Sequence, residues 1–313
     1  MLAAIVGIAI VNFGLVHLAP GDPVRMLAGE GGVADATAIQ QARAEFGLDR
    51  PLPVQLATQI GRTLTGDLGR SFRQRRPVSD LILERLPATL LLTGASLVLA
   101  IVLGCSIGTF AALRHGGWAD RLVSVVALLF YATPTFWVAL LLVLVFSVWL
   151  DWLPAYGNAS IQSATTAGGR MLDLLSHAVL PVFSLGLYHA AIYARLTRTA
   201  VLGVANSDFV RTATAKGLPG WRIVAAHILR NASLPVVTLI GLQAGQLVGG
   251  SVVVETIFAW PGIGRLAFEA LTQRDYPVLL GVFFVTSVLV IAANVVTDIA
   301  YGLIDPRTRA RPA

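Results

Sequence analysis

Six charge-free apolar runs divide the chain, and each is long enough to cross a bilayer as a helix. The hydrocarbon core of about 30 Å requires roughly 20 apolar residues in a helix. The runs cover residues 1–21, 86–113, 122–150, 174–194, 231–254 and 276–297. The first run lacks a basic start and a good cleavage site, so we interpret it as a retained span and not as a signal peptide. The pattern predicts an all-α membrane protein with six transmembrane helices.

Composition agrees with this class and excludes others. Of 313 residues, 56% are hydrophobic and only 13% are charged, whereas a soluble domain has about 25% charged residues. The net charge of +6 does not indicate a nucleic-acid partner, because a basic binding face must be solvated; lipid is the expected surrounding. The single cysteine, Cys105, lies in an apolar run and excludes a disulfide framework and a cysteine-based metal site.

The distribution of arginine and lysine predicts the orientation of the spans. Loops 114–121 and 195–230 and the tail after Gly302 carry two, six and three basic residues, whereas loops 151–173 and 255–275 carry one and two. Basic residues concentrate in cytoplasmic loops, so we expect both termini in the cytoplasm. Segment 20–85 holds nine arginines and eight acidic residues, and loops of this length cross regardless of charge.

Loop 195–230 has a pattern that charge alone does not require. Residues 206–208 (Asn-Ser-Asp) suit a helix N-cap, Gly217 suits the left-handed residue after a helix, and Pro219 suits the first turn of a second helix. Apolar residues of that second helix share one face at α-helical spacing: Trp221, Val224, Ala225 and Ile228. The pattern predicts a helix, a glycine turn and an amphipathic helix, which favours a docking element for a cytoplasmic partner over a simple topology anchor.

At these residues the sequence resembles a known family. RTATAKG followed by HILRNASLPVV resembles the cytoplasmic "EAA" loop of binding-protein-dependent ABC import permeases, in particular the dipeptide, oligopeptide and nickel branch. Six further segments resemble that branch and occur in the same order along the chain: HLAPGDPV, FGLDRPLPVQ, GDLGRSF, RLPATL, ETIFAWPGIGRLAFEAL and RDYPVLLG. The general loop pattern begins Glu-Ala-Ala, whereas this chain has Arg211, Thr212 and Ala213, with Gly217 in register.

The resemblance implies a type I ABC importer permease in a bacterial or archaeal inner membrane. It implies a first helix at 1–19, an extracytoplasmic region at 20–85 beside which a substrate-binding protein docks, a five-helix core at 86–303 and a cytoplasmic tail at 304–313. Further implied partners are a homologous second permease subunit, forming a heterodimer, and two cytoplasmic ATPase subunits that carry ATP and Mg. The residues implied to contact the ATPases are Arg211, Thr212, Ala213, Lys216, Gly217 and Leu218.

The chain itself should bind no cofactor and catalyse no reaction. Its only lysine, Lys216, is followed by glycine, so there is no P-loop, and no HExxH motif occurs. We expect the substrate to be a di- or oligopeptide, with a nickel or other metal chelate, or glutathione, as alternatives. A secondary transporter or channel is a more remote alternative, since no inverted repeat is evident.

Six residues are candidates for the pore or its gate: Glu255, Trp260, Pro261, Gly262, Asp298 and His189. Glu255 and Asp298 lie at span ends, where we expect water or a headgroup to reach them. Residues 260–264 (WPGIG) predict a tight extracellular turn over the translocation path, with packing as the equal alternative. His189 lies within the fourth span, where a packed, hydrogen-bonded histidine is the more common case.

Overall fold

The computed structural model describes residues 6–11, 13–14, 51–160 and 166–304, and these are predominantly helical. The elements are α4 Leu52–Leu64, α5 Val78–Leu113, α6 Trp118–Ala132, α7 Thr135–Leu142, the π-helix η1 Val143–Trp149, α8 Ala167–Ala205, α9 Asp208–Ala215, α10 Gly220–Arg222, the π-helix η2 Ile223–Leu229, α11 Arg230–Ile257, α12 Ile263–Thr272 and α13 Tyr276–Ile304. The expected all-α class is confirmed for this part of the chain.

Four described helices are long and apolar enough to cross a membrane. They are Val78–Leu113, Ala167–Ala205, Gly220–Gln243 and Tyr276–Thr297, and a fifth is obtained if α6 is joined with α7 and η1. Most of the predicted first span at 1–19 lies outside the described residues, although residues 6–11 and 13–14 are helical. Residues 20–50 and the tail from 305 also lie outside them, so the six-span count stays a prediction.

The predicted third span, 122–150, is not one straight helix. α6 and the pair α7–η1 meet at an angle of 104°. The bend lies at Thr133, which has extended φ and ψ of −86° and 131°, directly before Pro134. Proline disfavours the helical region for the residue that precedes it. The apolar run continues through this break, so a hydropathy pattern could not reveal the bend.

The other long helices extend beyond the apolar runs that predicted them. α5 begins at Val78 instead of residue 86, and α8 continues to Ala205, through the first part of the predicted loop 195–230. α12 occupies part of the predicted loop 255–275. Hydropathy marks only the apolar part of a helix, whereas charged residues such as Glu84 are compatible with the same helix once it leaves the apolar region.

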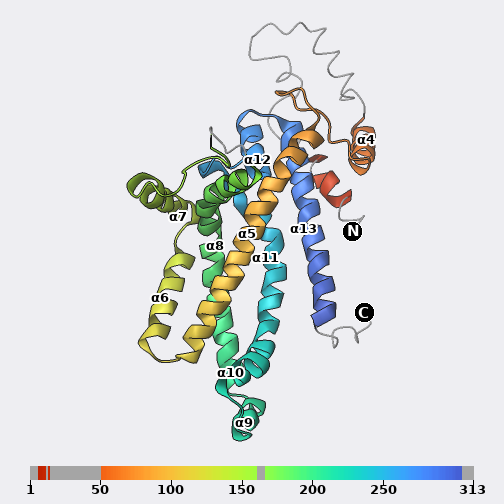
Figure 1. Cartoon of the computed structure of the whole chain (residues 1–313). Coiled ribbons are helices and arrows are strands. Elements are labelled where there is room, and N and C mark those ends of the chain that lie inside the picture. The colour runs from red at the N-terminus through yellow and green to blue at the C-terminus, as the bar shows by residue number, and fades with distance from the viewer. Residues whose placement is uncertain (1–5, 12, 15–50, 161–165, 305–313) are drawn as a thin grey trace, which may run out of the picture.

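α5, α8 and α11 run lengthwise through the molecule, with α9 and α10 at one end and α4 and α12 at the other (Figure 1). Each end has its own buried apolar cluster. The α9-end cluster comprises Ala112, Val201, Val210, Ala213, Ile223, Ile228 and Ala232. The α12-end cluster comprises Val78, Leu81, Ile82, Ile263, Leu266, Ala267, Ala270, Val278 and Val282. The two ends are therefore separate packing units connected by the long helices.

Candidate functional site

The loop at the α9 end (residues 206–222, here the α9 loop) is built around a defined glycine turn. α9 ends with Lys216 as its C-cap, and Gly217 follows with φ of +75°. The Gly217 N–H donates to the Thr214 carbonyl at 2.9 Å, and the Leu218 N–H donates to the Ala213 carbonyl at 3.4 Å. These two bonds are those of a Schellman motif, in which a left-handed residue closes a helix. The expected positive φ at Gly217 is confirmed.

The inner side of the α9 loop is packed against the long helices. Val210 and Ala213 of α9 are 7% and 5% exposed, and Val201 of α8 is 1% exposed; all belong to the α9-end cluster. Leu218 packs against the same cluster, as the hydrophobic contact of a Schellman turn requires. The loop is therefore joined to α5, α8 and α11 through buried side chains, so a displacement of α9 would be passed to these helices.

The outer side of the α9 loop presents aromatic and cationic side chains. Phe209 is 45% exposed and Trp221 is 70% exposed, and the Arg222 guanidinium lies 5.6 Å from the Trp221 ring. The Arg211 side chain is 76% exposed, and Lys216 is exposed as well. Exposed aromatic and arginine residues are typical of surfaces that bind another protein.

The predicted apolar face of the second helix is confirmed at Ile228 and Val224, which lie in or against the α9-end cluster. It was wrong at Trp221 and Ala225, which are exposed. Pro219 is the N-cap, not a residue of the first turn, and residues from Ile223 to Leu229 are wound as a π-helix. A π-helix bonds residues five apart, so Ile223 and Ile228 face the α9-end cluster together. Trp221, which α-helical spacing placed on the buried face, lies outside it.

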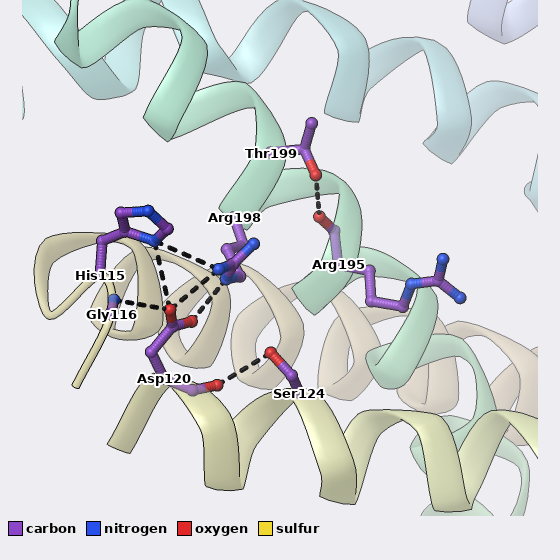
Figure 2. Close-up of polar contacts among 7 residues, drawn as sticks. All are labelled: His115, Gly116, Asp120, Ser124, Arg195, Arg198 and Thr199. Atoms are coloured by element: carbon purple, nitrogen blue, oxygen red, sulfur yellow. Dashed lines mark hydrogen bonds and ion pairs between the residues drawn. The ribbon is translucent and has the colours of Figure 1, made fainter. Parts of the chain in front are cut away.

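A polar contact next to the α9 end joins the turn between α5 and α6 to α8 (Figure 2). Arg198 of α8 donates to both carboxylate oxygens of Asp120, with Nε at 2.5 Å and Nη2 at 2.9 Å. The Gly116 N–H donates to the same carboxylate at 3.0 Å, and His115 Nδ1 lies 3.2 Å from it. The side chains of Asp120 and Arg198 are 5% and 26% exposed, so this bidentate pair is partly shielded from water, and it joins α6 to α8.

At the opposite end, Glu255 lies at the centre of a buried hydrogen-bond network. Its Oε1 accepts from Thr89 Oγ1 at 2.8 Å and from Ser251 Oγ at 3.0 Å, and its Oε2 accepts from the Arg265 N–H at 2.9 Å. The Thr89 hydroxyl oxygen accepts from the Ile263 N–H at 2.8 Å. Glu255 is 0% exposed, which corrects the expectation that water reaches it. Its carboxylate occupies the N-terminus of α12, where unpaired N–H groups favour negative charge.

The WPGIG turn is packed around this carboxylate. Trp260 is 0% exposed, and its Nε1–H donates to the Ala88 carbonyl at 2.9 Å. A side chain at Gly262 would collide with the Glu255 carboxylate, and Pro261 between them is half-buried. The predicted gate residues thus join α5, α11 and α12 in one packed unit in this conformation.

The remaining two candidates lie on different helices. His189 of α8 is 8% exposed, and its Nδ1 lies 3.2 Å from Oε1 of Gln243 of α11. Asp298 belongs to α13, and its side chain lies outside the described part of the chain. The structure therefore separates the predicted site residues into an α9-end group, an α12-end group and His189 between them.

Sequence reasoning missed four residues that fix the geometry of these ends. Asp120 and Arg198 are 78 positions apart, and Thr89 is 166 positions from Glu255, so no local motif connects them. At the α12 end, Asp275 is 3% exposed and accepts from Ser71 Oγ at 2.5 Å and from the Phe72 N–H at 3.1 Å. The sequence indicated such a contact only through the position of an acidic residue next to a predicted span, as at Asp120.

Fold and site together define a helical membrane protein whose long helices connect the α9 loop at one end to a packed, hydrogen-bonded unit at the other. The chain belongs to the family of binding-protein-dependent transport system inner membrane components, whose profile matches residues 84–310. The profile of the N-terminal segment of such components matches residues 1–93. The chain is accordingly a multi-pass membrane protein of a binding-protein-dependent transport system.

Individual relatives cover almost the whole chain. It is 37% identical to the dipeptide transport system permease protein of Escherichia coli (strain K12), over 99% of this chain and 96% of that protein. It is 40% identical to the di/tripeptide transport system permease protein of Pseudomonas aeruginosa, over 97% and 94%. It is 42% identical to the glutathione transport system permease protein of Escherichia coli O6:H1, over 96% and 94%.

A solved structure shares the fold. A chain in the inward-facing structure of the MetNI methionine ABC transporter aligns with a TM-score of 0.55 over 72% of this chain and 96% of that chain. The sequence identity is 19%, so the likeness concerns the fold alone.

Proposed function

We propose that this chain is one of two permease subunits of an ATP-driven importer of di- and oligopeptides. An extracytoplasmic binding protein delivers the peptide, and two cytoplasmic ATPases bind and hydrolyse ATP and Mg. The whole-chain identity of 37% and 40% to dipeptide and di/tripeptide permeases supports this substrate class. The chain crosses the membrane six times in this proposal, with both termini and the α9 loop in the cytoplasm.

The observation that carries the proposal is the construction of the α9 loop. Its outer side presents Phe209, Trp221 and exposed cations, whereas its inner side is buried against helices that extend to the other end. A surface that only anchors topology needs neither the Schellman turn at Gly217 nor the buried cluster. We assign the outer side, with Arg211 and Lys216, to the ATPase and the inner side to force transmission.

The opposite end receives the binding protein in this proposal. There, Ser71 and the two residues that follow it bond to Asp275 before α13, which joins segment 70–77 to the helices. The buried Glu255 network then connects α5, α11 and α12 beneath it. ATP-driven motion of the α9 loop would have to rearrange or rotate this unit to open the outer side of the path.

A second candidate substrate is glutathione, because the chain is 42% identical to a glutathione permease. Glutathione is itself a short peptide, so both candidates need the same kind of path. Uptake by proteoliposomes that contain the complete importer distinguishes them: labelled alanyl-alanine and labelled glutathione are supplied in parallel with the binding protein.

The docking surface can be tested by site-specific photo-crosslinking. A benzophenone amino acid at Trp221, which is 70% exposed, should crosslink to the ATPase subunit in membranes. The same amino acid at Trp152 of the opposite end, which is 69% exposed, is the matched control and should not. Crosslinking of the ATPase to position 152 instead of 221 would reverse the proposed orientation, and crosslinking to neither would refute the docking surface.

A further inference from the structure

Arg195 of α8 differs from the basic residues around it. It directly follows the apolar run 174–194 and is exposed. None of the ion pairs between described residues includes Arg195, whereas Arg198, one turn further on, is paired with Asp120. The Arg195 guanidinium instead lies 5.8 Å from the centroid of the Tyr131 ring of α6. Figure 2 shows it directed away from Asp120, along the course that α6 takes from Asp120 to Ser124.

The direction of this side chain can be worked out from two contacts. Arg198 meets Asp120, and the Tyr188 ring stacks on the Tyr131 ring with 5.8 Å between centroids and 11° between planes, so α6 and α8 are antiparallel. Tyr188 precedes Arg195 by about 10 Å along the helix, at about 1.5 Å per residue. To reach Tyr131, the Arg195 side chain must therefore extend from the α9 end back toward the middle of the span.

An arginine that faces lipid at the end of a span extends the other way. Its aliphatic part covers apolar surface while the guanidinium reaches the headgroups and water. A guanidinium that extends toward the middle of the bilayer instead requires a polar, water-accessible surrounding. The position of Arg195 therefore indicates that this side of α6 and α8 faces the aqueous translocation path and not lipid.

The neighbouring side chains fit such a path. Tyr131, whose ring lies next to the guanidinium, is 45% exposed, and Tyr188, which stacks on it, is half-buried. Behind them, the His189 ring contacts the Tyr188 ring edge-on at 5.2 Å and is held by Gln243 of α11. Two helices, α6 and α8, thus contribute an aromatic surface, with one cation beside it that has no carboxylate partner among the described residues.

We propose that Arg195, with the rings of Tyr131 and Tyr188, binds the C-terminal carboxylate of a peptide as it passes through the chain. A guanidinium forms two parallel hydrogen bonds with a carboxylate, and the tyrosine faces accommodate apolar groups and the peptide ammonium. Each peptide with a free C-terminus offers the same carboxylate, so the site tolerates different sequences. This inference rests on the proposed peptide function and adds to it a residue and a chemistry of recognition.

Binding can be measured without the binding protein. The importer with its partner subunits is placed in nanodiscs of zwitterionic lipid, and saturation-transfer NMR records contact with alanyl-alanine and with its C-terminal amide. Arg195→Gln should weaken dipeptide binding by roughly 10- to 100-fold, the range for a lost hydrogen bond to a charged group. Arg195→Lys should lie between, because it keeps the charge without the planar geometry. The amide should bind equally weakly to wild type and Arg195→Gln.

The matched control is Arg121→Gln. It removes a different exposed arginine, which lies on α6, and should leave dipeptide binding unchanged. Three results would overturn the inference. The dipeptide could give equal signals in wild type and Arg195→Gln, or no signal in wild type. The substitution could also weaken binding of the amide as much as binding of the dipeptide. Native mass spectrometry tests for a bound lipid. If wild type retains an anionic phospholipid that Arg195→Gln loses, and dipeptide binding is unchanged, the guanidinium binds a lipid headgroup and the inference is wrong. Failure of the peptide function is seen separately, as absence of ATP-driven alanyl-alanine uptake by the wild-type importer.

Discussion

Replacement of Gly217 by valine tests the α9 loop at its most constrained position. A residue with a Cβ atom at φ of +75° costs about 1–2 kcal/mol in backbone energy. A Cβ atom placed on Gly217 has no heavy atom within 4 Å, so the cost comes from the backbone and not from a collision. About 1–2 kcal/mol corresponds to a 5- to 30-fold change in an equilibrium. The docked geometry of the loop should become less populated by about this factor.

Membrane insertion and subunit assembly should be normal in Gly217→Val, because the long helices and both buried clusters retain their side chains. We expect the rate of peptide uptake to fall, and we expect ATP hydrolysis to respond poorly to the loaded binding protein. Both rates are measured in proteoliposomes with wild type, Gly217→Asn, Gly217→Ala and Gly217→Val. Asparagine adopts the left-handed region most readily of the three, so activity should fall in that order.

The control is Gly203→Val in α8. Gly203 is exposed, a Cβ atom added to it would also have no heavy atom within 4 Å, and it lies within a regular helix, so the same substitution meets no left-handed backbone. This variant should transport at close to the wild-type rate. If Gly217→Val also does so, the Schellman turn has no role in coupling and the reasoning is wrong.

Three further substitutions test the packed units. Glu255→Ala should lower the thermal unfolding midpoint of the purified importer by an amount equivalent to more than about 3 kcal/mol, because three hydrogen bonds to a buried carboxylate are lost. Glu255→Gln should lower the midpoint less. Equal midpoints for Glu255→Ala and wild type would contradict the network. Asp120→Asn should speed amide exchange at the start of α6, because the charged hydrogen bonds from Arg198 are weakened; unchanged exchange would contradict its role. Asp275→Ala should make segment 70–77 sensitive to trypsin, whereas Asp67→Ala, which removes a carboxylate bonded to the nearby Gly69 N–H, should not; equal sensitivity of the two would contradict the tie to α13.

Local signals in the sequence predicted the glycine turn of the α9 loop. Gly217 lies between a helix-forming segment and a proline, and only a residue tolerant of positive φ fits that position, so its conformation followed from chain chemistry alone. The positions of the apolar runs likewise predicted where the long helices lie, because burial of backbone polar groups in a bilayer requires helices.

Long-range contacts and departures from α-helical geometry could not be predicted in the same way. The bend at Thr133 is invisible to hydropathy, since both sides are apolar. The π-winding of η2 places Ile223, not Trp221, in the buried cluster, and α-helical spacing could not predict it. The burial of Glu255 depends on Thr89, a partner in a distant part of the chain, so its sequence neighbours gave no indication of it.

The most direct test of the account is ATP-dependent peptide uptake by the complete importer. Proteoliposomes contain this chain with its second permease and ATPase subunits, and the peptide-loaded binding protein is added on the side opposite the α9 loop. The account predicts that labelled alanyl-alanine accumulates only when ATP is present on the α9-loop side, and that this chain alone neither binds nor hydrolyses ATP. Uptake that proceeds without ATP and follows an ion gradient would contradict it, because the chain would then be a secondary transporter.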